Sequence, residues 1–141
     1  MTDELPEPQR YTGYLIRRAQ QRHVAAWARL VSTQTSSVQF AVLTVLAGLG
    51  EASQQQLCAA VDLDRSTIAD VVARMEQRGL LTRRRAIDDR RRNITVLTPA
   101  GQAELERLRP GVEAVERELT GGLGADEREA LRSGLRRVLD G

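Results

Sequence analysis

The chain has 141 residues, a length typical of one globular domain that buries a core without the support of disulfide bonds or metal ions. The formal net charge is only +2, but all 21 basic residues are arginine, and nine of them lie between positions 62 and 98 against six acids. A single cysteine excludes an internal disulfide, and one cysteine with one histidine leaves no ligand set for a structural zinc, so we expect no metal and no cofactor.

The first ten residues, MTDELPEPQR, are unlike a targeting sequence. They are acidic and contain two prolines, whereas a signal peptide begins with basic residues and continues with an apolar core. The longest weakly polar run, from Phe40 to Gly50, is far too short to cross a bilayer. We therefore expect a cytoplasmic protein that does not bind membranes.

Residues 10–31 predict a long helix with an apolar stripe. His23 and Trp27 are four residues apart and lie on that stripe, with Arg17 at its edge. One interpretation is a packed tryptophan beside a core histidine. The other is a site for a small aromatic carboxylate, in which Arg17 binds the carboxylate, His23 donates a hydrogen bond and Trp27 stacks on the ring.

The next three helices together predict a helix-turn-helix. Ser36 or Ser37 begins a central, buried helix, and Ser53 begins a short third helix. The turn VDLD then leads to a fourth helix, which Gly79 ends. A short helix, a tight turn and a helix with a polar N-terminal face are typical of proteins that place the second helix in the major groove of DNA.

The fourth helix carries an apolar face that includes Ile68 and Met75, and a polar face opposite it. Small hydroxyls and an arginine near a helix start suit contacts with base edges. Asp70 lies four residues before Arg74, so an ion pair between them is the favoured alternative to a base contact. From this helix we predict DNA contacts by Arg65, Ser66, Thr67, Asp70 and Arg74.

The segment that follows predicts a hairpin, which we call the wing. Ile94 and Val96 alternate with polar residues, as in a strand with one buried face. Six arginines fall between positions 83 and 92 against two acids. A solvated charged hairpin is the ordinary explanation of such a run, but directly after a helix-turn-helix it favours contact with DNA phosphates. At the tip we predict DNA-binding roles for Asp89, Arg90, Arg91 and Arg92.

Two further helices close the chain. Thr98 and Pro99 suit the first positions of a fifth helix, and the linker GGLGAD leads to a sixth. Apolar residues of the fifth helix step by three and four, the spacing of a helix that packs along a partner helix. From this spacing we predict homodimerisation through Leu105, Leu108, Val112, Val115 and Leu119. The sixth helix carries the apolar residues Leu131, Leu135 and Val138.

The ordered set of these elements resembles the MarR family of bacterial regulators. The similarity lies in three segments that follow one another at the family's spacing. They are LDRSTIADVVARMEQRGLLTR, which covers the fourth helix and the residues that end it, DDRR at the tip of the wing, and LTPAG at the start of the fifth helix. The resemblance implies a mainly α fold, a winged helix-turn-helix with long N- and C-terminal dimerisation helices and a two-stranded β-wing. It also implies a homodimer formed by the first, fifth and sixth helices, with Leu131, Leu135 and Val138 in its interface. The chain would then divide into 1–34 and 99–141 for dimerisation and 35–98 for DNA binding. The dimer, commonly a repressor, would bind a pseudo-palindromic operator with recognition helices in major grooves and wings in minor grooves.

The resemblance extends to individual residues. On the matching positions, Arg91 corresponds to a minor-groove arginine, Asp89 to an acid that orients the wing, and Arg74 to an arginine that fixes helix to wing. The stretch YLIRRAQQRHVAAW resembles the first helix of members that sense hydroxybenzoate-type acids, which implies ligand roles for Arg17 and His23. A different effector, or none, is the alternative.

Other functions find less support. Some family members sense oxidants through a cysteine, but Cys58 lies in LCAAV without basic neighbours, which predicts a buried and inert thiol. The chain has no nucleophile–base pairing and no glycine-rich phosphate loop, so we do not expect an enzyme. A protein that only binds an acidic partner would explain the arginines, but not the polar face at Ser66 and Thr67.

Overall fold

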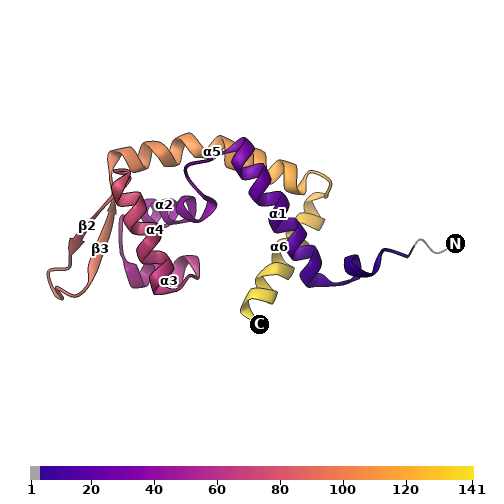
Figure 1. Ribbon diagram of the computed structural model, residues 1–141, viewed down its shortest axis with the longest axis horizontal. Coiled ribbons are helices and arrows are strands. Elements are labelled where there is room, and N and C mark those ends of the chain that lie inside the picture. The colour runs from indigo at the N-terminus through magenta and orange to yellow at the C-terminus, as the bar shows by residue number, and fades with distance from the viewer. Residues whose placement is uncertain (1–3) are drawn as a thin grey trace. The chain divides into compact units, whose positions relative to one another are not determined.

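The computed structural model describes residues 4–141 and confirms a mainly helical winged helix-turn-helix (Figure 1). A short 3₁₀ helix, Glu7–Arg10, precedes the first long helix. The elements are α1 Thr12–Leu30, α2 Ser37–Leu49, β1 Glu51–Ser53, α3 Gln54–Val61, α4 Arg65–Gln77, β2 Leu81–Arg85, β3 Asn93–Leu97, α5 Pro99–Thr120 and α6 Ala125–Asp140. None of the helices within residues 4–141 combines the length and the apolar character needed to cross a membrane.

Contacts between residues divide the chain into two compact units. Among the described residues, the terminal unit comprises 4–31 and 110–141, and the central unit comprises 32–109. The boundary lies within α5 at Pro110, so the first half of α5 belongs to the central unit. The sequence-based division had placed all of 99–141 in one C-terminal segment.

Serine caps begin two helices of the central unit. Ser36 accepts a hydrogen bond from the backbone N–H of Gln39 at 3.1 Å, and the Gln39 side chain accepts one from the Ser36 N–H. Ser53 and Gln56 repeat this capping box at α3. Both caps lie where the sequence predicted helix starts.

The recognition helix α4 also ends as predicted. Gly79 follows it with a φ of 75°, a left-handed conformation that glycine adopts without strain. The Gly79 N–H donates to the Glu76 carbonyl, and the Leu80 N–H donates to the Met75 carbonyl. The chain thereby turns from α4 directly into the wing.

The sheet has three strands in the order β1-β3-β2, all antiparallel. Strands β2 and β3 form the predicted hairpin, with Leu81 opposite Leu97 and Arg85 opposite Asn93. Strand β1 was not predicted; it pairs with the outer edge of β3, so that Ser53 lies opposite Ile94. Because β1 ends where α3 begins, this pairing joins the base of the wing to the helix-turn-helix.

The central unit is built around a buried apolar core. Ile68, Val72 and Met75 of α4 are fully buried, which confirms the predicted apolar face. The other large side chains buried in this unit include Val42, Leu43, Leu46, Leu57, Leu81, Leu105 and Leu108. The polar face of α4 is left at the surface.

Two ion pairs hold together the helices of the terminal unit. Arg29 of α1 binds Glu118 of α5 at 2.6 Å, and Arg132 of α6 binds Glu116 of α5 at 3.0 Å. A Cβ atom at Gly111 would lie only 2.5 Å from the Leu30 carbonyl oxygen, so glycine permits a close approach of α5 to the end of α1. The N- and C-terminal helices are therefore in contact, as expected.

The burial of three residues within a single chain corrects part of the predicted dimer interface. Leu105, Leu108 and Val115 expose 0%, 1% and 2% of their surface within a single chain, so they have no surface left for a second chain. Val112 and Leu119 are partly exposed. The α6 residues of the prediction, Leu131, Leu135 and Val138, are exposed. A step of three and four residues shows that a helix packs on another, but not whether that helix belongs to the same chain.

Candidate DNA interface and effector site

The start of α4 presents a short polar face to solvent. Arg65, Ser66 and Thr67 are all exposed. Asp64 caps the helix, its carboxylate accepting hydrogen bonds from the Thr67 N–H at 2.7 Å and from the Ser66 hydroxyl at 2.9 Å. These bonds, led by that from the Thr67 backbone, hold the pKa of Asp64 below its ordinary value of 3.8. The cap thus fixes the first turn from which side chains can reach base edges.

Asp70 and Arg74 lie further along the same exposed face. The Arg74 guanidinium contacts the Asp70 carboxylate at 3.1 Å, so the i,i+4 ion pair expected as the alternative to a base contact is present. Both side chains are more than 60% exposed, which leaves them accessible to a ligand.

A different pair connects α4 to the wing. Arg83 of β2 donates to Glu76 of α4 at 2.9 Å, which lowers the pKa of Glu76 and raises that of Arg83. Arg74, to which the family resemblance gives a role in fixing the helix to the wing, is paired here with Asp70 of its own helix. The sequence signal for Glu76–Arg83 was an acid at the end of α4 followed by a base at the start of the hairpin.

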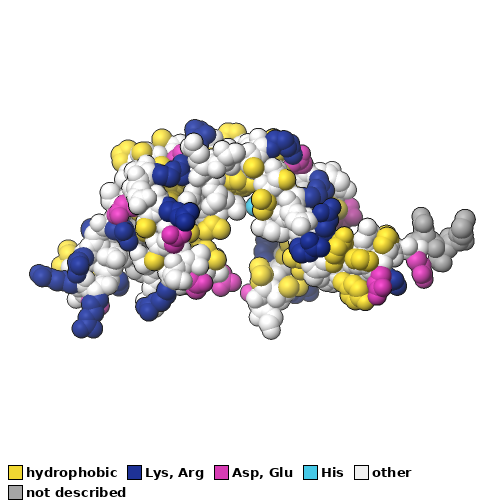
Figure 2. Space-filling view, viewed as in Figure 1, with side chains coloured by type: hydrophobic (Ala, Val, Ile, Leu, Met, Phe, Trp, Pro, Cys, Tyr) yellow, Lys and Arg dark blue, Asp and Glu magenta, His cyan; other side chains and the backbone are white. Residues whose placement is uncertain are grey.

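The wing arginines fall into two groups. Arg84 is paired with Glu51 of β1, Arg92 with Asp88 at 3.1 Å, and Arg85 donates to the Arg90 carbonyl at 3.2 Å. Within the described part of the chain, the guanidinium groups of Arg90 and Arg91 have no hydrogen-bond or ion-pair partner. Arginine side chains protrude from the wing in Figure 2, at the end where Figure 1 places β2 and β3.

Asp89 shapes the turn from which Arg91 projects. Its carboxylate accepts a hydrogen bond from the Arg91 N–H at 3.0 Å, and its carbonyl accepts one from the Arg92 N–H at 3.0 Å. Beside this turn, Ile87 is 99% exposed, although it is a large apolar residue. Ile87 was not predicted as a site residue; its signal in the sequence is an apolar side chain directly before the acids Asp88 and Asp89 of a hairpin tip.

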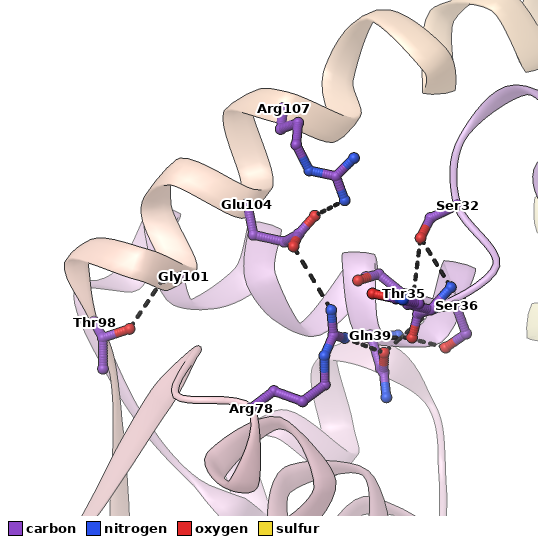
Figure 3. A network of polar contacts seen from close by, with 10 residues as sticks. Ser32, Thr35, Ser36, Gln39, Arg78, Thr98, Gly101, Glu104 and Arg107 are labelled. Atoms are coloured by element: carbon purple, nitrogen blue, oxygen red, sulfur yellow. Dashed lines mark hydrogen bonds and ion pairs between the residues drawn. The ribbon is translucent and has the colours of Figure 1, made fainter.

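The far end of α4 is anchored by Arg78, which sequence reasoning also overlooked (Figure 3). Its guanidinium donates to the Gln34 carbonyl and to the Gln39 side chain, both at 3.3 Å, and contacts Glu104 of α5 at 3.6 Å. The Glu104 side chain is only 13% exposed and also binds Arg107. One arginine therefore fixes the end of the recognition helix against α2, α5 and the segment before α2.

The three residues of the predicted effector site do not meet within one chain. His23 and Trp27 contact each other, with ring centroids 5.8 Å apart and planes tilted by 51°, and Trp27 is only 7% exposed. The Arg17 guanidinium instead lies over the ring of Tyr14, 5.3 Å from its centroid. Arg17 also borders an open groove of about 580 Å³ along α1, beside Ile16 and Val24, whereas His23 and Trp27 do not line this groove.

Cys58 does not have the surroundings expected from the sequence. Its thiol is partly exposed and lines a cavity together with arginines of α4 and the wing, so the prediction of a buried thiol without basic neighbours is wrong. The local sequence shows only what precedes and follows Cys58, whereas the fold places arginines from distant positions around the same cavity. Among residues 4–141, no cluster of histidine, cysteine and acidic side chains is suited to hold a metal ion.

Known proteins share both this sequence and this fold. Residues 35–92 match the model of the MarR family. The HTH-type transcriptional repressor NicR of Pseudomonas putida is 35% identical over 129 residues, which are 91% of this chain and 82% of that protein. The PcaV transcriptional regulator of Streptomyces coelicolor, crystallised with its natural ligand, is 36% identical with a TM-score of 0.93 over 97% of both chains.

A third relative connects the fold with an effector. A structure of Bordetella bronchiseptica BpsR, described as explaining the regulation of its DNA binding by 6-hydroxynicotinic acid, is 35% identical with a TM-score of 0.82. The similarity covers 89% of this chain and 96% of that one. With the exposed face of α4 and the arginine-tipped wing already described, these matches lead to one conclusion: the chain belongs to the MarR family of transcriptional regulators.

Proposed function

We propose that this protein is a transcriptional repressor whose dimer binds a pseudo-palindromic operator and is released from it by a small aromatic carboxylate. The observation that carries the DNA-binding part is the pairing of an exposed polar face on α4 with two unpartnered arginines at the wing tip. Hydroxyls on a helix suit base edges in a major groove, whereas guanidinium groups on a narrow hairpin suit phosphates or a minor groove.

The two surfaces have separate roles in this proposal. Thr67 supplies sequence preference, so Thr67→Ala changes the ranking of operator variants more than the dependence on salt. Arg91 supplies charge, so its removal weakens binding to most sequences alike. Fluorescence anisotropy on a set of operator variants at several salt concentrations tests this division of roles. Equal losses for both variants with an unchanged salt slope would show that it is wrong.

We propose the homodimer on the basis of the apolar side chains that the terminal unit leaves exposed. On α6, Leu131, Leu135 and Val138 expose 45%, 41% and 61% of their surface, and on α1 Leu15 and Ile16 expose 50% and 42%. Large apolar side chains left exposed in this way are typical of a protein interface. Sedimentation at micromolar concentration tests the proposal, and a monomer would contradict it.

The proposed effector carries a carboxylate on an aromatic ring, like the acid in the description of BpsR. Arg17 beside the apolar groove can bind the carboxylate as a fork, and His23 and Trp27 offer a hydrogen bond and a flat ring. Because these groups lie apart in one chain, we propose that a second copy completes the pocket.

A titration with hydroxybenzoates and hydroxynicotinates tests the effector directly. Trp27 is the only tryptophan, so its fluorescence reports binding beside it. We expect a fluorescence change and a loss of operator binding in parallel, both absent in Arg17→Ala. A ligand that favours the non-binding state by about 3 kcal/mol weakens DNA binding roughly 150-fold. If no aromatic acid alters either signal at millimolar concentration, Arg17, His23 and Trp27 have a packing role only.

A further inference from the structure

The start of α5 holds the turn that joins the recognition helix α4 to the wing. The Thr98 hydroxyl donates a hydrogen bond to the Gly79 carbonyl, and the Thr98 N–H donates one to the Leu80 carbonyl at 3.2 Å. Further along α5, the Glu104 carboxylate contacts the Arg78 guanidinium at 3.6 Å. In Figure 3, Arg78 reaches toward Glu104 from the end of α4. Three consecutive residues of the turn are therefore bound to α5.

Gly101 lets α5 lie directly against this turn. A Cβ atom at position 101 would lie 2.0 Å from the Leu80 carbonyl oxygen and 3.0 Å from its carbon. These are backbone atoms, so they cannot yield by a change of rotamer. The turn therefore packs closely against α5, and the end of α4 is fixed there.

Arg78 also connects this end of α4 to α2. Its guanidinium donates to the Gln39 side chain, which accepts from the Ser36 N–H as part of the cap of α2. A planar guanidinium that contacts acceptors on α2 and α5 fixes an orientation as well as a distance, because its donors lie in one plane. The Glu104 side chain is mostly buried, so little water competes for its contact with Arg78.

The anchored end of α4 lies far from the residues that we assign to base contacts. Thr67 precedes Arg78 by about three helical turns, or roughly 17 Å along the helix axis. A tilt of about 3° about the anchored end would therefore move the first turn of α4 by roughly 0.9 Å. Hydrogen bonds to base edges need a narrow range of distances, whereas attraction between charges falls slowly with distance. The tilt of α4 should thus affect sequence preference more than overall affinity.

We propose that Arg78 and Glu104 are positioning residues for operator recognition. Their contact holds α4 at the tilt that brings Ser66 and Thr67 to the base edges, although neither belongs to the face that we assign to DNA contact. The inference rests on the proposed function, in which that face reads sequence. Glu104 gives the sharper test, because a mostly buried carboxylate does not bind phosphates. A loss of preference on its removal would therefore be transmitted through the protein.

The test measures sequence preference as the ratio of two affinities. Fluorescence anisotropy gives the affinity for an operator duplex from upstream of the protein's own gene and for a scrambled duplex. Glu104→Ala should lower the ratio about tenfold, which is the effect of losing roughly one base contact. Glu106→Ala removes the same charge from an exposed position of α5, frees an arginine as Glu104→Ala does, and should keep the wild-type ratio. An unfolded fraction lowers both affinities alike and cancels in the ratio.

Two further variants separate positioning from direct contact. If Arg78 bound a phosphate, Arg78→Gln would reduce the slope of log affinity against log salt by about 1. As a positioning residue, it should lower the ratio and leave the slope unchanged, and it repeats the test should Glu104→Ala fold poorly. In a protein that already carries Thr67→Ala, Glu104→Ala should cause a smaller loss than it does alone, because both changes act on the same base contact.

The outcomes distinguish the positioning role from the proposed function. A lowered ratio in Glu104→Ala and Arg78→Gln, with Glu106→Ala at the wild-type value, supports the positioning role. Wild-type ratios in the first two variants, an equal loss in Glu106→Ala, a reduced salt slope in Arg78→Gln, or an undiminished loss beside Thr67→Ala overturns it and leaves the proposed function intact. A wild-type protein with equal affinity for both duplexes contradicts the proposed function, and this inference with it.

Discussion

The central and terminal units differ in what they leave exposed. In the central unit, Leu49 and Ile87 are the only large apolar side chains among those that the structure shows as strongly exposed, and the surface of α4 and the wing is polar and basic. In the terminal unit the exposed side chains include Leu15, Ile16 and Val24 of α1. On α6 they include Leu131, Leu135, Val138 and Leu139.

The two units therefore present two kinds of surface, each suited to a different partner. The central unit buries its apolar residues within one chain and presents charge, which suits a polyanion. The terminal unit leaves apolar area in water, which suits a second copy of the same chain. One family fold therefore combines a unit that buries most of its apolar side chains with a unit that leaves several of them exposed. Each of the following predictions concerns a substitution in one of the two units.

The largest effect is expected from the terminal unit. Leu135→Asp places a charge in the exposed apolar face of α6 and should dissociate the dimer. Because a dimer binds both half-sites at once, its loss should weaken operator binding by about 100- to 10,000-fold. Leu49→Asp, at an exposed leucine of the central unit, is the matched control and should leave both properties unchanged. Sedimentation measures the dimer, and fluorescence anisotropy measures the affinity for operator DNA. A Leu135→Asp protein that remains dimeric would exclude α6 from the dimer interface.

A smaller loss is expected from the wing. Arg91→Ala removes an unpartnered guanidinium, and should lower DNA affinity about tenfold and the slope of log affinity against log salt by about 1. Arg84→Ala removes an arginine that is already paired with Glu51, so the slope should change less. Equal slopes for the two variants would show that pairing within the wing does not decide which arginine binds DNA.

The anchor of the recognition helix should affect stability. Arg78→Ala leaves the mostly buried Glu104 carboxylate with Arg107 alone and removes two hydrogen bonds, at an expected cost of about 1 kcal/mol in unfolding free energy. Arg107→Ala is the control, since its side chain is 59% exposed and such pairs contribute about 0–1 kcal/mol. Urea denaturation measures both. A larger loss for Arg107→Ala would contradict the anchoring role of Arg78.

The smallest effect is expected from the cap of α4. The pKa of Asp64 is lowered in the folded protein, so its contribution to stability is fully present above its ordinary pKa of 3.8 and is lost as the pH falls through the lower, folded value. Asp64→Asn keeps a capping oxygen but does not titrate. The difference in stability between the two proteins should therefore narrow below pH 3.8, and a pH-independent difference would exclude this assignment.

Local signals in the sequence predicted the elements well, because each was complete within a few residues. Ser36, Ser53 and Gly79 mark helix ends through bonds to their immediate neighbours, and they lie where expected. Strand β1 was missed because its three residues have no pattern of their own and depend on pairing with β3, some forty positions later. The helix-turn-helix and the wing could each be predicted from residues close together in the sequence. The pairing of β1 with β3, which joins the two, could not.

Side-chain partners were harder to predict than elements. Arg83, Arg84 and Arg91 look alike in the sequence, yet two are paired within the protein and one is not, because only the fold brings Glu76 and Glu51 to the first two. The burial of Leu105 and Leu108 and the basic surroundings of Cys58 likewise depend on segments distant in sequence. The Asp70–Arg74 pair was foreseen because one helical turn separates its members.

The most direct test of the account is the stoichiometry of the protein on DNA taken from upstream of its own gene. Sedimentation of a labelled duplex with increasing protein gives the number of chains bound and, at two salt concentrations, the dependence on ionic strength. We expect two chains per operator, strong preference over a scrambled duplex, and affinity that falls with salt. One chain per duplex, or equal affinity for the scrambled sequence, would contradict the claim that a dimer of this chain reads DNA through α4 and the wing.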